Sequence, residues 1–118
     1  MEYFITNEQE REREEIVIDL GASRRGELNE IFFRAFGWGV KKLLGMMFGS
    51  EAAIPVRIKG NKQEIASFTQ AMGKEKKYMK SAAKYGLNNP KTYKSKYELR
   101  KAAAKFEKKT GIKWPFKG

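Results

Sequence analysis

Hydrophobic and polar positions alternate along two short stretches of this chain in the pattern of β-strands. IPVRIKG (54–60) sets three aliphatic residues at every second position, with Arg57 and Lys59 between them, and this alternation predicts a half-buried strand. EEIVIDLG (14–21) predicts a second short strand or extended leg that ends in glycine. The two runs are candidates to pair with each other, although a two-stranded element alone is only marginally stable.

The clearest helical pattern runs from residue 62 to about residue 85. Asn61 followed by Glu64 forms a capping box at its start. Gly86 followed by Leu87 predicts a left-handed C-terminal cap closed by a hydrophobic contact. At 100° per residue the lysines gather on one face of this helix, and the apolar residues gather on the opposite face. The apolar face holds Ile65, Phe68, Met72, Met79, Ala82 and Ala83.

A second C-terminal helix is expected to pack against the first as a hairpin. Pro90 starts a single helical turn, and Ser95 with Glu98 forms a capping box for a helix over 96–109 that Gly111 ends. Its inward residues are Leu99, Ala102, Ala103 and Phe106. The following IKWPF folds back to close a small core. Together the patterns predict a mainly α fold with a minor β component: amphipathic helices, a C-terminal helical hairpin and one or two short strands.

Residues 28–49 predict another helix with an unusually wide apolar surface. Their apolar side chains cover roughly 220° of the helix circumference, about twice the stripe of a helix that packs on one side only. The longest uncharged run, LLGMMFGS, is far shorter than the roughly 20 residues that span a bilayer. We therefore expect no transmembrane segment.

The glycines of this segment favour an interpretation in which it docks another protein chain. Gly37, Gly45 and Gly49 lie on one ridge, where a neighbouring backbone can approach closely. A large apolar surface on the outside of a protein marks a contact site. The residues expected to dock are Phe36, Trp38, Leu43, Leu44, Met46, Met47 and Phe48. In the alternative interpretation, the helix breaks at Gly37–Gly39 and both pieces fill the protein's own core.

The charge is strongly positive and unevenly distributed. The chain has 25 Lys and Arg against 14 Asp and Glu, a net charge of +11. Residues 1–22 hold seven acidic and two basic side chains. Residues 23–73 hold four acidic and eight basic side chains, and residues 74–118 hold three acidic and fifteen basic ones. Within residues 1–22 we expect a helix capped at Thr6. We expect an acidic N-terminal arm at 1–22, an apolar glycine-containing helical segment at 23–53, and a basic strand plus helical hairpin domain at 54–118.

The lysines of the hairpin are candidates to bind nucleic acid or an acidic protein. Lysine predominates over arginine there, which favours neutralisation of phosphates over the reading of bases. The candidate binding residues are Lys74, Lys77, Lys80, Lys84, Lys101, Lys105 and Lys108. Four tyrosines, Tyr78, Tyr85, Tyr93 and Tyr97, are able to stack on unpaired bases, but we favour the interpretation that they seal the edges of the core.

Side chains that carry chemistry are scarce. The chain has no cysteine and no histidine, which excludes disulfides, thiolate nucleophiles, imidazole catalysis and zinc sites built on those residues. We expect no cofactor, no metal and no enzymatic activity. The N-terminus lacks the order of a secretion signal, so a cytoplasmic location, or one inside or on a viral particle, is expected.

Two functions follow from these patterns. The first is a structural or assembly subunit of a larger complex, such as a viral particle, which docks on other protein subunits through the apolar helix and the acidic arm. Such a subunit presents its lysine face to nucleic acid or to an acidic protein. The alternative is a freestanding DNA- or RNA-binding accessory protein without sequence specificity.

Overall fold

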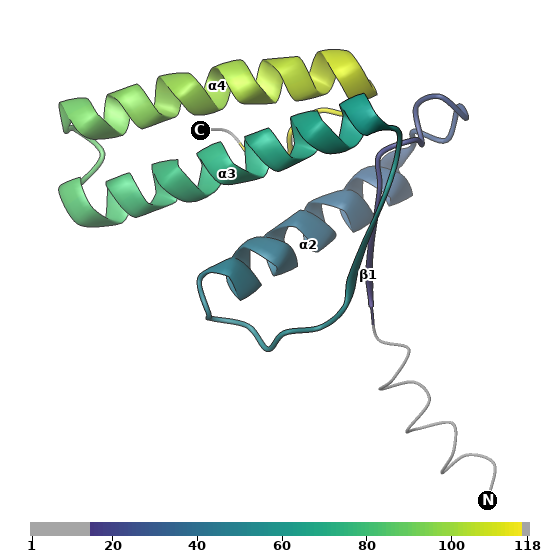
Figure 1. Cartoon of the computed structure of the whole chain (residues 1–118), viewed down its shortest axis with the longest axis horizontal. Coiled ribbons are helices and arrows are strands. Elements are labelled where there is room, and N and C mark those ends of the chain that lie inside the picture. The colour runs from purple at the N-terminus through teal and green to yellow at the C-terminus, as the bar shows by residue number, and fades with distance from the viewer. Residues whose placement is uncertain (1–14, 117–118) are drawn as a thin grey trace, which may run out of the picture.

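The computed structural model describes residues 15–116, which form three helices and a two-stranded sheet (Figure 1). The elements are β1 (Ile16–Asp19), α2 (Glu30–Met47), β2 (Val56–Lys59), α3 (Lys62–Tyr85) and α4 (Pro90–Thr110). Helices hold 62% of the described residues, so the predicted mainly α fold with a minor β component is confirmed. The helix expected at Thr6 lies outside the described residues.

The two apolar runs pair as predicted, and they do so in parallel. Ile16 of β1 lies opposite Val56 of β2, and the Ile16 amide donates to the Pro55 carbonyl oxygen at 2.9 Å. The strands are parallel because α2 carries the chain back between them, as a crossover connection requires. Ile16 and Ile18 are buried on the face toward α2, whereas Val17 on the other face is 45% exposed.

Helix α2 is continuous, and the alternative of a break at Gly37–Gly39 is wrong. Asn29 caps it, accepting a hydrogen bond from the Phe32 amide at 2.8 Å. One face is buried and packs on β1 through Gly39, where an added Cβ would lie 3.2 Å from Ile16 Cγ2. The close backbone approach that glycine permits is therefore used inside the protein, between α2 and its own strand.

The N-terminal cap of α3 is the one that the sequence predicts, whereas its C-terminal cap differs from the prediction. Asn61 and Glu64 form the predicted capping box. Gly86 has a positive φ of 83°, but its ψ of 170° is extended rather than left-handed helical. The chain therefore leaves the helix without folding back over it, and Leu87 is 64% exposed. The predicted hydrophobic contact of Leu87 at this cap is wrong.

Helix α4 begins six residues before the predicted main helix. Asn89 caps it and Pro90 is its first residue, a position where the missing amide hydrogen of proline costs nothing. Ser95 does not start a new helix. Its hydroxyl donates to the Lys91 carbonyl oxygen at 3.1 Å and lies 3.0 Å from the Ser81 hydroxyl. A serine bonded in this way is satisfied inside a helix, so the predicted single turn and the helix after it are one element.

A cluster of aromatic rings joins the three helices. Phe36 of α2 stacks on Phe106 of α4 with ring centroids 6.0 Å apart, and Phe68 of α3 lies 6.4 Å from Phe36. Trp114, after α4, meets Phe106 edge to face at 5.3 Å, as expected of the segment that folds back. The apolar segment 23–53 and the hairpin therefore share one core. In Figure 1, α3 and α4 run side by side in opposite directions, with α2 on one side of the pair.

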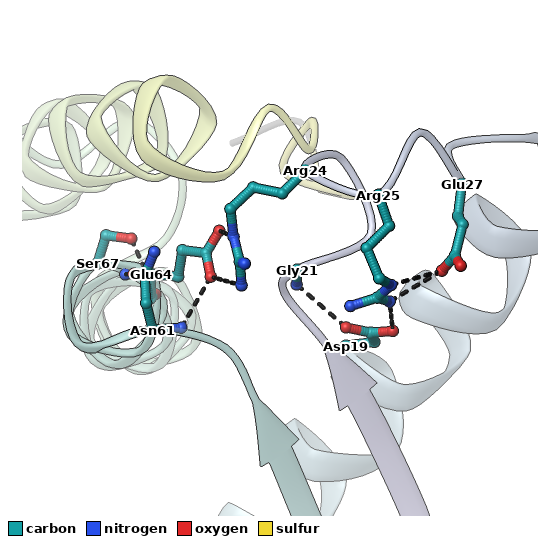
Figure 2. A network of polar contacts seen from close by, with 8 residues as sticks. All are labelled: Asp19, Gly21, Arg24, Arg25, Glu27, Asn61, Glu64 and Ser67. Atoms are coloured by element: carbon teal, nitrogen blue, oxygen red, sulfur yellow. Dashed lines mark hydrogen bonds and ion pairs between the residues drawn. The ribbon is translucent and has the colours of Figure 1, made fainter.

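A polar network fixes the loop between β1 and α2 against the start of α3, as Figure 2 shows. Arg24 donates from Nε and Nη2 to the two carboxylate oxygens of Glu64, at 3.0 and 2.9 Å. Glu64 also accepts from the Asn61 amide at 2.8 Å. Arg25 pairs with Asp19 and with Glu27. These groups satisfy one another, so the network holds the fold together rather than forming a binding site.

Candidate functional site

The hairpin separates its apolar side chains from its lysines. On α3, Phe68 and Met72 are buried in the core. At 100° per residue, Gln70 and Lys74 lie on the other side of this helix, where they line a hollow together with Lys101 and other residues of α4. This side is opposite the one through which Phe68 and Phe106 pack on Phe36 of α2.

The lysine seam is a groove along the boundary of α3 and α4. One hollow of about 310 Å³ is lined by residues of both helices, and a second of about 230 Å³ continues it toward the start of α3. The two hollows share Gln70 and Lys105. We define the seam by the lysines that line it or border it: Lys74, Lys77, Lys101, Lys105 and Lys109. The structure thus brings together four of the lysines that were predicted as binding residues: Lys74, Lys77, Lys101 and Lys105.

Glu98 of α4 is the acidic residue of the seam. Its Oε2 accepts from Lys74 Nζ and from Lys77 Nζ, at 3.2 Å each. The hydrogen bond from Lys74, followed by that from Lys77, lowers the pKa of the Glu98 carboxyl group. Part of the charge of these two predicted lysines is thus neutralised within the hairpin. Lys101 and Lys105 supply charge farther along the groove.

Lys80 and Lys84 lie on a different groove. This groove, of about 370 Å³, runs along α3 and is lined by residues that include Lys76 and Tyr85. The Lys84 ammonium lies 5.2 Å from the centre of the Tyr85 ring. Hydrogen bonds and charge from Lys84, and from Lys91 of α4, lower the pKa of the Tyr85 hydroxyl. Six of the seven predicted lysines are therefore divided between two neighbouring grooves, with Lys77 at both.

One predicted binding residue lies outside the seam. Lys108 is exposed but lines neither groove, whereas Lys109 lines the seam. The spacing contained the signal, because Lys101, Lys105 and Lys109 follow one another at intervals of four residues, which places them in one row on a helix. Gln70 was also missed, since an uncharged residue on an amphipathic helix gives no charge signal.

Three of the four tyrosines are exposed. Tyr85 is 36% exposed, Tyr93 is 54% exposed and Tyr97 is 64% exposed. The interpretation that the tyrosines seal the edges of the core is therefore wrong for Tyr93 and Tyr97. It fits only Tyr78, which is half-buried.

The predicted docking residues divide between the core and the surface. Phe36 and Leu44 are 3% and 4% exposed. They face β1 and the hairpin, so the prediction that they belong to the docking surface is wrong. Leu43 and Met46 are half-buried. The exposed ones are Trp38 at 52%, Met47 at 37% and Phe48 at 38%, and the unpredicted Ile31 is exposed at 78%.

The glycine ridge is not an open track for a second backbone. A Cβ on Gly45 would clash with Glu51 Cγ, because the loop after α2 folds back over this position. A Cβ on Gly37 would meet Pro115, from the segment after α4, at 3.7 Å. The protein's own chain thus covers both sites.

Within residues 15–116, no group of three or more acidic side chains is placed to hold a metal ion. In the same range, every helix is too short or too polar to cross a bilayer. Comparison of the chain with protein-family models, curated proteins and solved structures finds no match, so its function is inferred from its own residues.

Proposed function

We propose that this chain is a non-enzymatic protein that binds the phosphate backbone of nucleic acid along the lysine seam. The observation that supports this proposal most strongly is the continuous groove between α3 and α4, which has lysines on both walls. Residues 74–109, which contain all five lysines of the seam, hold thirteen basic and three acidic residues. A groove of this charge attracts a polyanion and releases its condensed counterions.

The composition of the seam favours the backbone over the bases as the bound group. Lysine is a point charge with no planar fork, whereas specific base contacts are made mostly by arginine, asparagine and glutamine. The exposed rings of Tyr93 and Tyr97 lie on the same helix and provide surfaces for unpaired bases. The proposed binding is thus tolerant of sequence. Its settings are the cytoplasm or a viral particle.

The salt dependence of DNA binding tests this proposal. We expect a 20-base-pair duplex to bind roughly 500-fold more weakly at about 200 mM salt than at about 50 mM, as for a protein with about five phosphate contacts. The variant with Lys101→Gln, Lys105→Gln and Lys109→Gln should lower the slope of log K against log salt by roughly 2 to 3, since each contact contributes about 0.9. Fluorescence anisotropy at several salt concentrations measures both quantities.

The control for this experiment is Lys41→Gln, which removes one lysine charge from an exposed position on α2. It should change the slope of log K against log salt by no more than the value of one phosphate contact, about 0.9. An unchanged slope in the triple variant, or an equal loss of slope in Lys41→Gln, would contradict binding along the seam.

A second candidate function is assembly with other copies of the chain through the outer side of α2. Trp38 and Ile31 are exposed on this helix, and a tryptophan of this exposure is typical of contact sites. We propose Trp38 as the centre of such a contact. If light scattering shows a self-associated wild type, Trp38→Ala should be monomeric. Tyr97→Ala, which removes a still more exposed aromatic side chain from α4, should remain associated. A wild type that is monomeric at high concentration contradicts this second function.

A further inference from the structure

Glu75 is a buried carboxylate that neither the lysine seam nor the polar network uses. It lies on α3 and is 4% exposed. Its Oε1 accepts a hydrogen bond of 2.9 Å from the indole Nε1 of Trp114. Burial raises the pKa of the Glu75 carboxyl group, and the hydrogen bond from Trp114 opposes this effect. An ionised carboxylate is expensive to bury, so its position needs an explanation.

A pocket of about 530 Å³ lies against this carboxylate. It is enclosed by the end of α2, by α3 and by the segment after α4. Its apolar walls are formed by Leu44, Phe48, Met79 and Phe116. A volume of this size is in the range of pockets that hold small organic ligands.

The second oxygen of Glu75 is available to the pocket. Among residues 15–116, Oε1 has its bond to Trp114, and no hydrogen bond to Oε2 is formed. In the same range, every fully buried side-chain oxygen has a partner, so Oε2 is not sealed inside the protein. Because Glu75 lines the pocket and its Oε1 is held by Trp114, Oε2 is the carboxylate oxygen left for a ligand there.

The other charged side chains of the pocket stand at exposed positions. Glu51 pairs with Lys42 at 2.9 Å, and Lys41 is an exposed residue of α2. In the described part of the chain, neither Lys41 nor any other cation forms an ion pair with Glu75. The pocket thus combines apolar walls with one desolvated anionic acceptor.

We propose that this pocket binds an apolar chain that ends in a primary ammonium group, with the ammonium on Glu75 and the chain against the apolar walls. A charge-assisted hydrogen bond to a desolvated carboxylate is stronger than one between neutral groups, and the added cation removes the cost of the lone buried charge. The same chemistry is found in a free alkylamine and in a lysine side chain of another protein. The inference does not depend on nucleic-acid binding by the seam.

NMR of the full chain tests the proposal through the indole N–H of Trp114, which reports directly on Glu75. Titration with n-hexylamine at neutral pH should shift this resonance in a saturable way and leave the indole signal of Trp38 unchanged. Hexanol has the same apolar chain without the charge and should bind at least about tenfold more weakly. Equal binding of the two compounds, or no binding of hexylamine at millimolar concentration, would overturn the proposal.

Three variants separate the charge from the cavity. Glu75→Gln should remove the preference for hexylamine over hexanol, while Glu51→Gln, at the exposed carboxylate of the same pocket, should keep it. Met79→Trp fills the cavity from a 40% exposed position and should abolish binding of both compounds. Loss of the preference in Glu51→Gln but not in Glu75→Gln would contradict the assignment.

The source of the ammonium group is distinguished by a second ligand. Nα-acetyl-lysine-N-methylamide presents a lysine side chain as a protein would. Binding as tight as that of hexylamine supports a protein lysine as the natural occupant. Binding of hexylamine alone supports a free amine.

Discussion

At the scale of single residues, Glu64 connects three parts of the chain. It is 1% exposed, yet it accepts two hydrogen bonds from Arg24 and one from the Asn61 amide. The arginine comes from the loop after β1, and the amide belongs to the cap of α3. Through this carboxylate, the end of the sheet and the start of the hairpin are held in one arrangement.

The contribution of Glu64 to stability should depend on pH. The hydrogen bond from Arg24 lowers the pKa of Glu64 below its ordinary value of 4.5 in the folded state. The folded protein therefore holds this proton less tightly than the unfolded chain, and the stabilisation is complete above pH 4.5 and lost as the pH falls through the folded-state pKa. Glu64→Gln should cost about 1 to 3 kcal/mol of unfolding free energy at pH 7 and much less at pH 3.

Urea unfolding of both proteins at the two pH values measures this difference. Glu30→Gln provides the control, because Glu30 pairs with Arg34 at 3.1 Å on the exposed side of α2. Exposed pairs contribute little, so this variant should change the unfolding free energy by less than about 0.5 kcal/mol. An equal loss for Glu64→Gln at pH 3 and pH 7 would argue against an ionised Glu64 as the source.

At the scale of elements, the packing of β1 on α2 depends on one missing side chain. An added Cβ at Gly39 would lie 3.2 Å from Ile16 and 3.5 Å from Ile18. The strand therefore rests almost directly on the helix backbone. A larger residue would have to push the strand away, and within residues 15–116 no third strand holds the sheet in place.

Gly39→Leu should lower the unfolding free energy by about 1 to 3 kcal/mol, the usual cost of overpacking a well-filled core. Gly73 provides the matched comparison within a helix, because it is exposed and nothing lies within 4 Å of an added Cβ. Gly73→Ala should raise the unfolding free energy by about 0.5 to 1 kcal/mol, since alanine restricts the unfolded chain. Thermal or urea unfolding measures both, and a Gly39→Leu variant as stable as the wild type would contradict the close approach.

Capping boxes and apolar alternation predicted the helices and strands correctly where each pattern allowed one interpretation. The capping box of Asn61 and Glu64 marks the start of α3 correctly, and the alternating apolar residues mark β2. The start of α4 was placed incorrectly because Ser95 and Glu98 have the spacing of a capping box while serving other partners. Ser95 bonds within its own helix, and Glu98 binds lysines of α3. Only the packing of the two helices decides between these roles.

At the scale of the whole molecule, the candidate sites could be predicted only in part. Helical periodicity shows which face of the hairpin carries lysines, so most of the lysine seam follows from the sequence. The division of α2 into a buried and an exposed side depends on where β1 and Phe106 lie, which the sequence pattern does not contain. The pocket at Glu75 was not predicted, because its partner Trp114 is distant in the chain and comes close only through the fold.

The parallel pairing of β1 with β2 has a consequence for synthesis on the ribosome. Ile16 and Val56 are neighbours in the sheet but forty residues apart in the chain, and contacts between distant residues form late. The rings of Phe68 and Phe106 that cover α2 are translated later still. The apolar segment 23–53 therefore emerges without the surface that buries it, and it remains exposed to other nascent chains until the hairpin has been translated.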